Sequence, residues 1–144
     1  MAQQEGCIFC DIAKKKIKHW KVYEDEDTFA FLDINPRNPG HTVVIPKNHY
    51  ATVMDLPEKE TGPLFRAVWK VSKGIVDGTS ADGVSIAQSS GTSAGQLIQH
   101  IHFHVIPRFS NEDPVSIEGI LPIKKTIDSE KDKIVKKIVS KIPK

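Results

Sequence analysis

Cysteine is scarce in this sequence, since only Cys7 and Cys10 occur among 144 residues. Two cysteines cannot build the framework of several disulfides that holds a small extracellular scaffold together, and a Cys-x-x-Cys pair in a reducing compartment is typical of half a metal site or of a redox pair. Long apolar runs are also lacking, because none approaches the roughly 18 residues of a membrane-spanning helix. The first six residues have neither the basic nor the apolar region of a signal peptide. We therefore expect a cytoplasmic protein with no membrane partner.

An excess of charge of one sign is lacking as well. The 20 basic and 18 acidic residues leave a net charge of +2, and much of the basic excess lies in the last part of the chain. This balance gives no overall signal for a polyanionic partner, so we do not expect binding to nucleic acid. No internal repeat is visible, and the length suits one domain with a core of its own.

The order of apolar and polar residues predicts an α+β domain on a mainly antiparallel sheet. Short connections join most of the predicted strands, and one long helix separates the third strand from the fourth, which argues against alternating βαβ units. An apolar stripe indicates this helix, and Gly62–Pro63 places its regular start near Thr61. A short helix is predicted over Cys7–Lys16. The strands are predicted at Lys21–Glu24, Thr28–Leu32, His41–Ile45, Val84–Gln88 and His100–Ile106.

Residues 110–144 are predicted to be an extension of a domain that spans residues 1–109. Ser110–Pro114 is typical of a linker, and Ser129 is a candidate N-cap for a final helix. One face of that helix is apolar and the other carries lysines. We interpret it as an apolar stripe docked on the domain with a solvated lysine face. Recruitment of a partner or of RNA by the lysines is the alternative.

The residues suited to chemistry gather at His100–Ile106. Side chains alternate faces along an extended strand and neighbours on one face lie about 6.6 Å apart, so His100, His102 and His104 are expected to form a row. A single histidine in a strand is usually an ordinary half-buried side chain. Three in strict alternation offer nucleophiles, bases and metal ligands near neutral pH, which indicates a functional site.

This stretch resembles the signature of the histidine triad (HIT) family of nucleotide hydrolases and transferases, His-φ-His-φ-His-φ-φ with φ apolar. The likeness extends to Phe31–Pro36, to Gly40–Lys47 and to Ala94-Gly95-Gln96, in the order and spacing of the family, and covers the chain from about Cys7 to Arg108. The resemblance implies an α+β fold with a five-stranded sheet, one long and one short helix, and pairing into a two-fold homodimer.

The resemblance also implies catalytic roles. His102 matches the histidine that attacks the α-phosphorus of a nucleotide and forms a covalent nucleotidyl-histidine, which water then cleaves. His104 matches the histidine that contacts the phosphate oxygens and the leaving group, and His41 one that supports the imidazole row. Gln96 matches a residue that hydrogen-bonds the phosphate or the bridging atom. Gly95 lets the backbone approach the phosphate closely.

A purine nucleotide is the substrate that the resemblance implies. Asp33 matches the acid that accepts hydrogen bonds from the ribose hydroxyls, and Ser89 lies in the phosphate-binding loop. Ser89-Ser90 replaces the Asn-Asn or Asn-Glu of many relatives, and Leu97 replaces a frequent hydroxyl residue, so contacts with the leaving group are expected to differ. The residues that match an apolar slot for the base are Ile8, Phe9, Ile12 and Ile34.

Cys7 and Cys10 alone are a weak zinc signal, because a tetrahedral structural site needs four ligands. Family members with this Cys-x-x-Cys complete the site with histidines that match His49 and His100. The resemblance therefore implies a structural Zn²⁺ and the zinc-containing branch of bacterial or archaeal type. Four protein ligands leave no open position, so no cofactor is expected to be required for the chemistry.

The sequence thus predicts a nucleotide hydrolase or nucleotidyl transferase that acts at the α-phosphate of phosphoramidates, dinucleoside polyphosphates or adenylates. The loop Ser89–Gly95 is not a P-loop, because the Lys-Ser/Thr pair is missing. Two alternatives stay open. Triad histidines could bind a catalytic zinc, in which case chelation would stop activity with the fold intact. The protein could also be a non-catalytic nucleotide-binding or scaffold protein.

Overall fold

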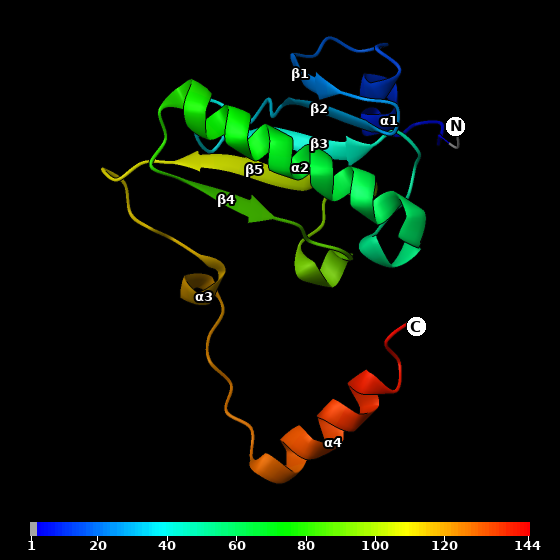
Figure 1. Cartoon of the computed structure of the whole chain (residues 1–144), viewed down its shortest axis with the longest axis vertical. Coiled ribbons are helices and arrows are strands. Elements are labelled where there is room, and N and C mark those ends of the chain that lie inside the picture. The colour runs from blue at the N-terminus through cyan, green and yellow to red at the C-terminus, as the bar shows by residue number, and fades with distance from the viewer. Residues whose placement is uncertain (1–2) are drawn as a thin grey trace. The chain divides into compact units, whose positions relative to one another are not determined.

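One antiparallel sheet organises the fold in the computed structural model, which describes residues 3–144 (Figure 1). The strand order is β1-β2-β3-β5-β4, and each neighbouring pair is antiparallel. This confirms the predicted α+β class. The strands of the described part are β1 (Lys21–Glu24), β2 (Thr28–Leu32), β3 (Thr42–Pro46), β4 (Gly83–Ala87) and β5 (Phe103–Arg108).

The central strand β3 and its neighbour β2 are buried on both faces. Their β-branched and aromatic residues suit a pleated, packed surface, and the register pairs Phe29 with Ile45 and Phe31 with Val43. Pro46 ends β3, because proline cannot supply the N–H that a longer ladder needs.

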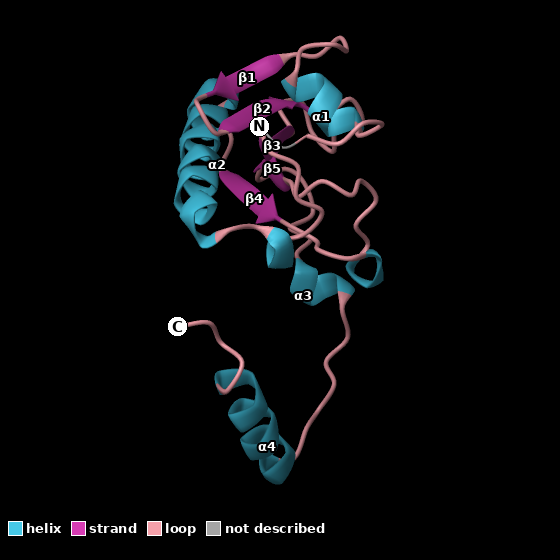
Figure 2. Cartoon of the chain, turned by 90° about the vertical axis from the view of Figure 1, so that its right-hand side faces the viewer, coloured by secondary structure: helices cyan, strands magenta, loops and turns pink. Residues whose placement is uncertain are grey.

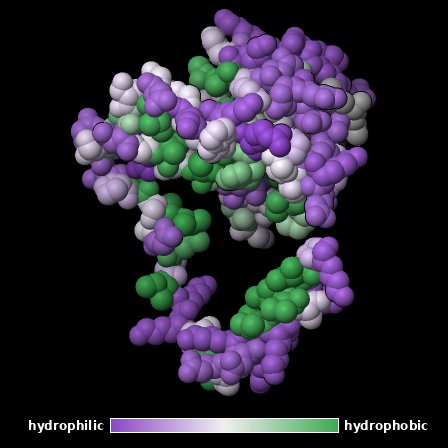
Figure 3. Space-filling view, in the orientation of Figure 1, coloured by the Kyte–Doolittle hydropathy of each residue, from purple (hydrophilic) through white to green (hydrophobic). Residues whose placement is uncertain are grey.

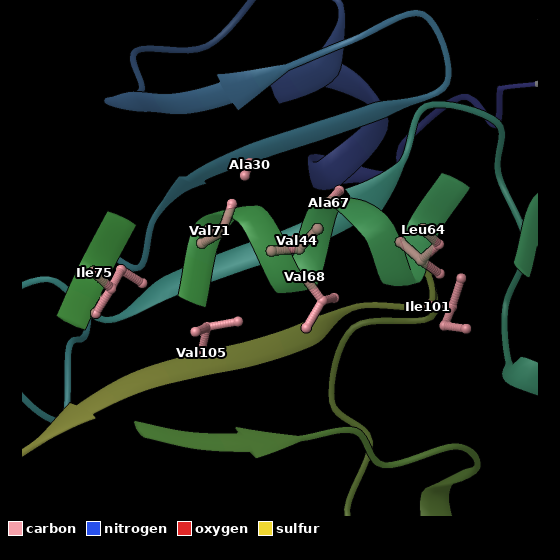
Figure 4. Packing of buried hydrophobic residues seen from close by; sticks show 9 residues of the cluster. All are labelled: Ala30, Val44, Leu64, Ala67, Val68, Val71, Ile75, Ile101 and Val105. Atoms are coloured by element: carbon pink, nitrogen blue, oxygen red, sulfur yellow. The ribbon is translucent and has the colours of Figure 1, made fainter. Parts of the chain in front are cut away.

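The long helix α2 (Glu58–Thr79) covers one face of the sheet. It begins three residues before the predicted start at Thr61, although Pro63 removes one helical hydrogen bond. Buried Glu60 accounts for this early start, because its carboxylate accepts hydrogen bonds from the Tyr50 hydroxyl and from Asn48 Nδ2 and so ties the first turn to the domain. Figure 4 shows the helix stripe packed on the strands; the cluster comprises Ala30, Val44, Leu64, Ala67, Val68, Val71, Ile75, Ile101 and Val105.

The short helix α1 (Ile8–Ala13) lies on the opposite face from α2, as Figure 2 shows. Ile12 and Ala13 join a second core cluster, against which Phe9 packs. The helix is shorter than the predicted Cys7–Lys16, because Lys15 has a positive φ of 63° that ends the helical path. Two short 3₁₀ turns, Val53–Asp55 and Thr92–Ala94, lie in the loops before α2 and before β5.

The chain divides into two units, the first ending at Glu112 and the second spanning Asp113–Lys144. The second unit contains α3 (Ile117–Ile120) and α4 (Asp128–Val139), and one side of α4 is apolar (Figure 3). The predicted cap Ser129 lies inside α4, so that prediction was wrong. Acidic residues of the first turn stabilise the helix start through the helix dipole instead of a capping side chain. No helix of the described residues is long and apolar enough to cross a membrane.

Candidate active site

The histidine row lies where the chain enters β5. His104 belongs to the strand, whereas His100 and His102 precede its first residue, Phe103. The prediction of a strand through all three was therefore wrong at its start. Ile101 N–H donates to the carbonyl of Tyr50 at 2.7 Å in place of a sheet partner. The Tyr50 carbonyl lies in a loop, so the alternation of apolar residues and histidines along the sequence could not reveal this hydrogen bond.

The ring of His102 is fixed in one tautomer. Its Nδ1 lies 2.7 Å from the carbonyl oxygen of His100, and a carbonyl can only accept, so Nδ1 carries the proton and Nε2 keeps its lone pair. Burial lowers the pKa of His102, which keeps the ring neutral at pH 7. The ring of Phe9 packs against the ring of His102 in a T-shaped arrangement, with ring centroids 5.0 Å apart. His102 therefore presents an unprotonated Nε2, which is the form in which an imidazole can act as a nucleophile.

A second chain of hydrogen bonds fixes His104. The backbone N–H of Arg37 donates to His41 Nδ1 at 3.0 Å, which leaves the proton of His41 on Nε2. That nitrogen lies 2.9 Å from His104 Nδ1, so His104 carries its own proton on Nε2. Burial lowers the pKa of His41 and lowers that of His104 to about 4. A neutral His104 can thus present an N–H donor to an oxygen.

Asp33 lies beside this histidine pair. Its Oδ2 is 3.5 Å from His41 Nε2 and 3.8 Å from His104 Nδ1, while Oδ1 accepts the backbone N–H of Asn35 at 2.8 Å. The nearer nitrogen is the protonated one, so the carboxylate supports the assigned tautomer of His41.

Gln96 is buried and its side-chain amide bonds to the backbone. Nε2 donates to the carbonyls of Ala51 at 2.6 Å and Ile98 at 2.9 Å, and Oε1 accepts from Gly91 N–H at 2.7 Å. Both amide protons are thus used within the protein in this conformation. Gln96 shapes the loop before the triad, in which Gly91 and Gly95 have φ angles of +91° and +90° that favour glycine.

A cavity of about 460 Å³ opens over His102 and His104, a size typical of small-molecule sites. It brings together all the predicted catalytic and nucleotide-binding residues except Ile12, which is buried in the second core cluster. The predicted residues that line it are Ile8, Phe9, Asp33, Ile34, His41, Ser89, Gly95, Gln96, His102 and His104.

Six further residues line the cavity, and of these only Leu97 was singled out from the sequence, as a departure expected to alter contacts with the leaving group. Ile106 was recoverable, because it lies two residues after His104 and therefore on the same strand face. Ala87 was not, because only the register of β4 against β5 places it opposite His104. The others are Asn35, Arg37, Leu97 and Ile98.

The predicted metal ligands Cys7, Cys10, His49 and His100 form a second cluster, with their ligand atoms all within 4.8 Å of one another. His100 Nδ1 lies 3.4 Å from Cys7 Sγ and 3.5 Å from Cys10 Sγ, and His49 Nδ1 lies 3.4 Å from Cys10 Sγ. Sulfur and nitrogen ligands at ~2.3 and ~2.05 Å from a tetrahedral ion would be about 3.6 Å apart, so the donor set fits zinc. His100 Nε2 lies 2.8 Å from the carbonyl of Pro46, which fixes the proton there and points the Nδ1 lone pair at the cysteines.

Asp33, His41 and His104 are also close enough to count as a possible metal cluster. The ligand nitrogens of the two histidines, however, lie 2.9 Å apart, closer than the ~3.3 Å expected for two nitrogens on a tetrahedral ion. The nitrogen of His41 that faces His104 also carries a proton. This group therefore fits a hydrogen-bonded relay better than a metal site.

An α+β domain with an antiparallel sheet, in which alternating histidines lie beside a cavity, is the architecture of the histidine triad proteins. Residues 14–111 match the model of the HIT domain, so this chain belongs to the HIT family.

Relatives in the family carry several names. An uncharacterised HIT-like protein of Methanocaldococcus jannaschii is 43% identical over 76% of this chain and 84% of its own length. The adenosine 5'-monophosphoramidase HNT1 of Candida albicans is 34% identical over 75% of this chain and 74% of its own. The adenylylsulfatase HINT3 of Arabidopsis thaliana is 33% identical over 92% of this chain and 67% of its own length. Related proteins are thus named as hydrolases, while others are uncharacterised.

Solved structures agree with the fold. A HIT family protein of Bacillus subtilis superposes with a TM-score of 0.83 at 34% identity, over 97% of this chain and 99% of that one. A zinc-bound histidine triad family protein of Mycobacterium smegmatis superposes with a TM-score of 0.71 at 36% identity, over 78% and 81%.

Proposed function

We propose that this protein is a hydrolase or nucleotidyl transferase for purine nucleotide derivatives, and that it acts at the α-phosphate through a covalent nucleotidyl-His102. The observation that carries the proposal is the fixed tautomer of His102. Its Nδ1 proton is held by the carbonyl of His100, so the Nε2 lone pair is free in the same cavity as the neutral N–H of His104 and the carboxylate of Asp33.

The first step forms a bond between His102 Nε2 and the α-phosphorus while the bond from phosphorus to the leaving group breaks. The leaving group departs with that electron pair; an amine takes its proton from solvent before or as the bond breaks, so that it leaves as the neutral amine. The His102 ring becomes cationic, and the carbonyl of His100 on its Nδ1–H stabilises the charge. The N–H of His104 donates to a phosphoryl oxygen as negative charge builds there.

The second step returns the enzyme to its starting form. Water attacks phosphorus, the bond to Nε2 breaks, the electron pair returns to the His102 ring, and the water proton passes to solvent. An alcohol or phosphate acceptor in place of water would make the same reaction a nucleotidyl transfer. Attack by an imidazole, followed by attack of water on a labile bond between phosphorus and nitrogen, replaces one slow displacement.

Apolar side chains near Asp33 support a purine nucleoside as the bound group. Ile34 and Ile8 line the cavity although they are 72% and 42% exposed, so they leave apolar surface for the face of a base. The carboxylate of Asp33 would accept hydrogen bonds from the ribose hydroxyls. Apolar walls recognise the base through its faces, so we propose little discrimination among purines.

We further propose a structural Zn²⁺ at Cys7, Cys10, His49 and His100, as in the zinc-containing branch of the family. When bound, the ion would neutralise the two thiolates and join three chain segments, and it would leave the phosphorus chemistry to the histidines. The expected metal content is one zinc per chain by elemental analysis. Cys10→Ser should lower both zinc content and Tm. A parent protein that is purified without metal, and that has the same Tm as Cys10→Ser, would contradict the site.

We also propose a homodimer. The strand β4 is an edge of the sheet and carries Ile86 at 45% exposure, and unpaired edges are usually covered by another element or chain. On the outer side of α2, Phe65 and Trp69 are 60% and 54% exposed and one helical turn apart. The mass in solution by light scattering tests the proposal, and a monomer at micromolar concentration would contradict it.

The function is tested by incubation with a panel of adenosine and guanosine α-phosphate derivatives. We expect turnover of at least one linkage, and a nucleotidyl adduct on His102 when the reaction is quenched in seconds and analysed by peptide mass spectrometry. His102→Ala should abolish turnover while nucleotide binding persists, and His19→Gln, outside the cavity, should leave turnover unchanged. Full turnover by His102→Ala would overturn the mechanism.

The two alternatives give different outcomes in the same assay. A catalytic metal predicts immediate loss of activity on chelation, restored by zinc, with the fold intact. A non-catalytic binding protein predicts nucleotide binding with no turnover and no adduct on any histidine.

A further inference from the structure

We propose that Ala87, Leu97 and Ile106 form an apolar subsite for the leaving group, and that Leu97 makes the protein prefer substrates whose leaving group carries an alkyl or aryl chain. The inference rests on the proposed function and names its substrate class. It begins from two facts: Leu97 is 89% exposed, and it nevertheless lines the cavity.

The strand register places this subsite next to the histidine row. Ala87 pairs with His104, and directly paired residues of antiparallel strands point to the same face. Ile106 lies two residues beyond His104 on β5 and so shares that face as well. Leu97 reaches the cavity from the loop that precedes the triad. The apolar group thus continues the catalytic face toward β4.

The base slot lies on the other side of the row. Phe9 packs against His102 and Phe31, and Phe31 belongs to β2, which the strand order separates from β4 by β3 and β5. Ile34 and Asp33 follow directly after β2. With the nucleoside on the β2 side and phosphorus at His102, the β4 side is left for the group that departs.

The chemistry of the β4 side suits an uncharged apolar group. None of its three side chains can donate or accept a hydrogen bond, and Ser89 is the only serine or threonine among the described residues that line the cavity. Among the described residues that line the cavity, Arg37 is the only lysine or arginine, and it lies in the loop between β2 and β3. Arg108 follows Ile106 on the same face of β5 but is not part of that lining, and its side chain bonds to Glu112 at 2.8 Å and to Ser85 at 3.1 Å. A sulfate or polyphosphate leaving group would therefore meet no cationic side chain of the cavity lining on the β4 side. An alkyl or aryl chain would bury the exposed surface of Leu97.

A series of adenosine 5'-phosphoramidates of methylamine, butylamine and hexylamine tests the subsite, because these amines have similar basicity and differ in apolar length. We expect kcat/KM for amine release to rise about fourfold for each methylene that becomes buried. The rate at which water hydrolyses the nucleotidyl-His102 adduct should be the same for all three phosphoramidates, because the adduct no longer contains the leaving group.

Leu97→Ser should flatten the dependence on chain length and leave adduct hydrolysis unchanged, whereas Leu97→Met should keep the dependence. Leu121→Ser, which replaces an exposed leucine outside the cavity lining, is the matched control and should behave as the parent protein. Because Leu97 is exposed, little change in Tm is expected. Equal kcat/KM for all amines, or an unchanged slope in Leu97→Ser, would overturn the subsite alone. Absence of any His102 adduct would overturn the proposed function as well.

Discussion

At the scale of residues, one backbone N–H decides which nitrogen His104 presents to the cavity. The Arg37 amide donates to His41, His41 donates to His104, and His104 is left with its proton on the nitrogen that faces outward. His41 therefore acts through His104, and it should be replaceable by another side chain that donates at the same place. This separates a positioning role from one of simple packing.

We predict that His41→Gln keeps more activity than His41→Leu. The amide of glutamine can donate to His104 Nδ1, whereas leucine leaves that nitrogen free to take the proton and turns the lone pair of His104 toward the phosphate. Loss of one preorganised donor costs about 100-fold in kcat, so His41→Leu should lose roughly that factor and His41→Gln much less. Steady-state kcat with the best substrate of the panel is the measurement.

Comparison of Tm with kcat distinguishes this positioning role from a structural one. Both variants fill the same buried space, so similar Tm values with different kcat values support the relay. Equal activity of the glutamine and leucine variants would show that donation by His41 is not needed.

The positions of several site residues followed from the sequence, and those of others depended on contacts that the sequence does not contain. Alternation and resemblance were sufficient to group His102, His104 and Asp33, which the structure brings into one cavity. The bonds of Gln96 could not be predicted, because its amide partners include Ala51, which is 45 residues away along the chain. Ile12 fits an apolar slot and a core equally well by pattern, and only packing places it in the core.

At the scale of elements, the strands were the most predictable part of the chain. Their β-branched and aromatic runs between turn residues gave the bounds of β1 and β2 and placed β3 and β4 within one residue. The starts of α2 and β5 were harder, because tertiary hydrogen bonds to Glu60 and to Tyr50 override the local signal at both places. Errors at element ends thus coincide with long-range contacts.

Glu24, the last residue of β1, makes an element-scale prediction about acid stability. Lys47 lies 3.0 Å from its carboxylate and Lys15 and Lys21 lie 3.2 Å away, which lowers the pKa of Glu24 to about 2. A lowered pKa means that the ion pairs stabilise the fold fully above the unfolded pKa of about 4.3, and that this stability is lost as pH falls from there through the folded pKa of about 2. Because the group is partly exposed, we expect a contribution of about 1 kcal/mol or less.

Glu24→Gln should therefore lower the free energy of unfolding by up to about 1 kcal/mol at pH 7, and the difference should disappear as pH falls below about 2. Urea titrations across this range measure it. Glu26→Gln, which changes an exposed glutamate in the adjacent turn, is the control. A difference between Glu24→Gln and the parent that stays constant across the pH range would contradict the ion-pair explanation.

At the scale of the whole molecule, contacts between distant segments hold the site together. The proposed zinc ligands come from residues 7, 10, 49 and 100, and His100 also supplies the carbonyl that fixes His102. The end of the first unit is held in a similar way. Glu112 accepts hydrogen bonds from Arg108 Nε at 2.8 Å and Phe109 N–H at 3.0 Å, and from Asn38 Nδ2 at 3.1 Å. The sequence placed the domain end at residue 109, because Ser110–Pro114 has the composition of a linker. Composition does not reveal that Glu112, within this segment, bonds back to the domain.

This arrangement predicts where the chain can be shortened. A protein that ends at Glu112 should keep the kcat of the full chain, because every described residue that lines the cavity lies before Pro107. A protein that ends at Phe109 should have a lower Tm, because Asn38 and Arg108 lose the carboxylate that accepts from them. Glu112→Gln in the full chain separates the lost contact from the lost length, and should lower Tm in the same direction by a smaller amount, since its amide oxygen still accepts one bond. If both truncated proteins melt at the same temperature, Glu112 does not anchor the end of the domain; if ending at Glu112 removes activity, the extension contributes to catalysis.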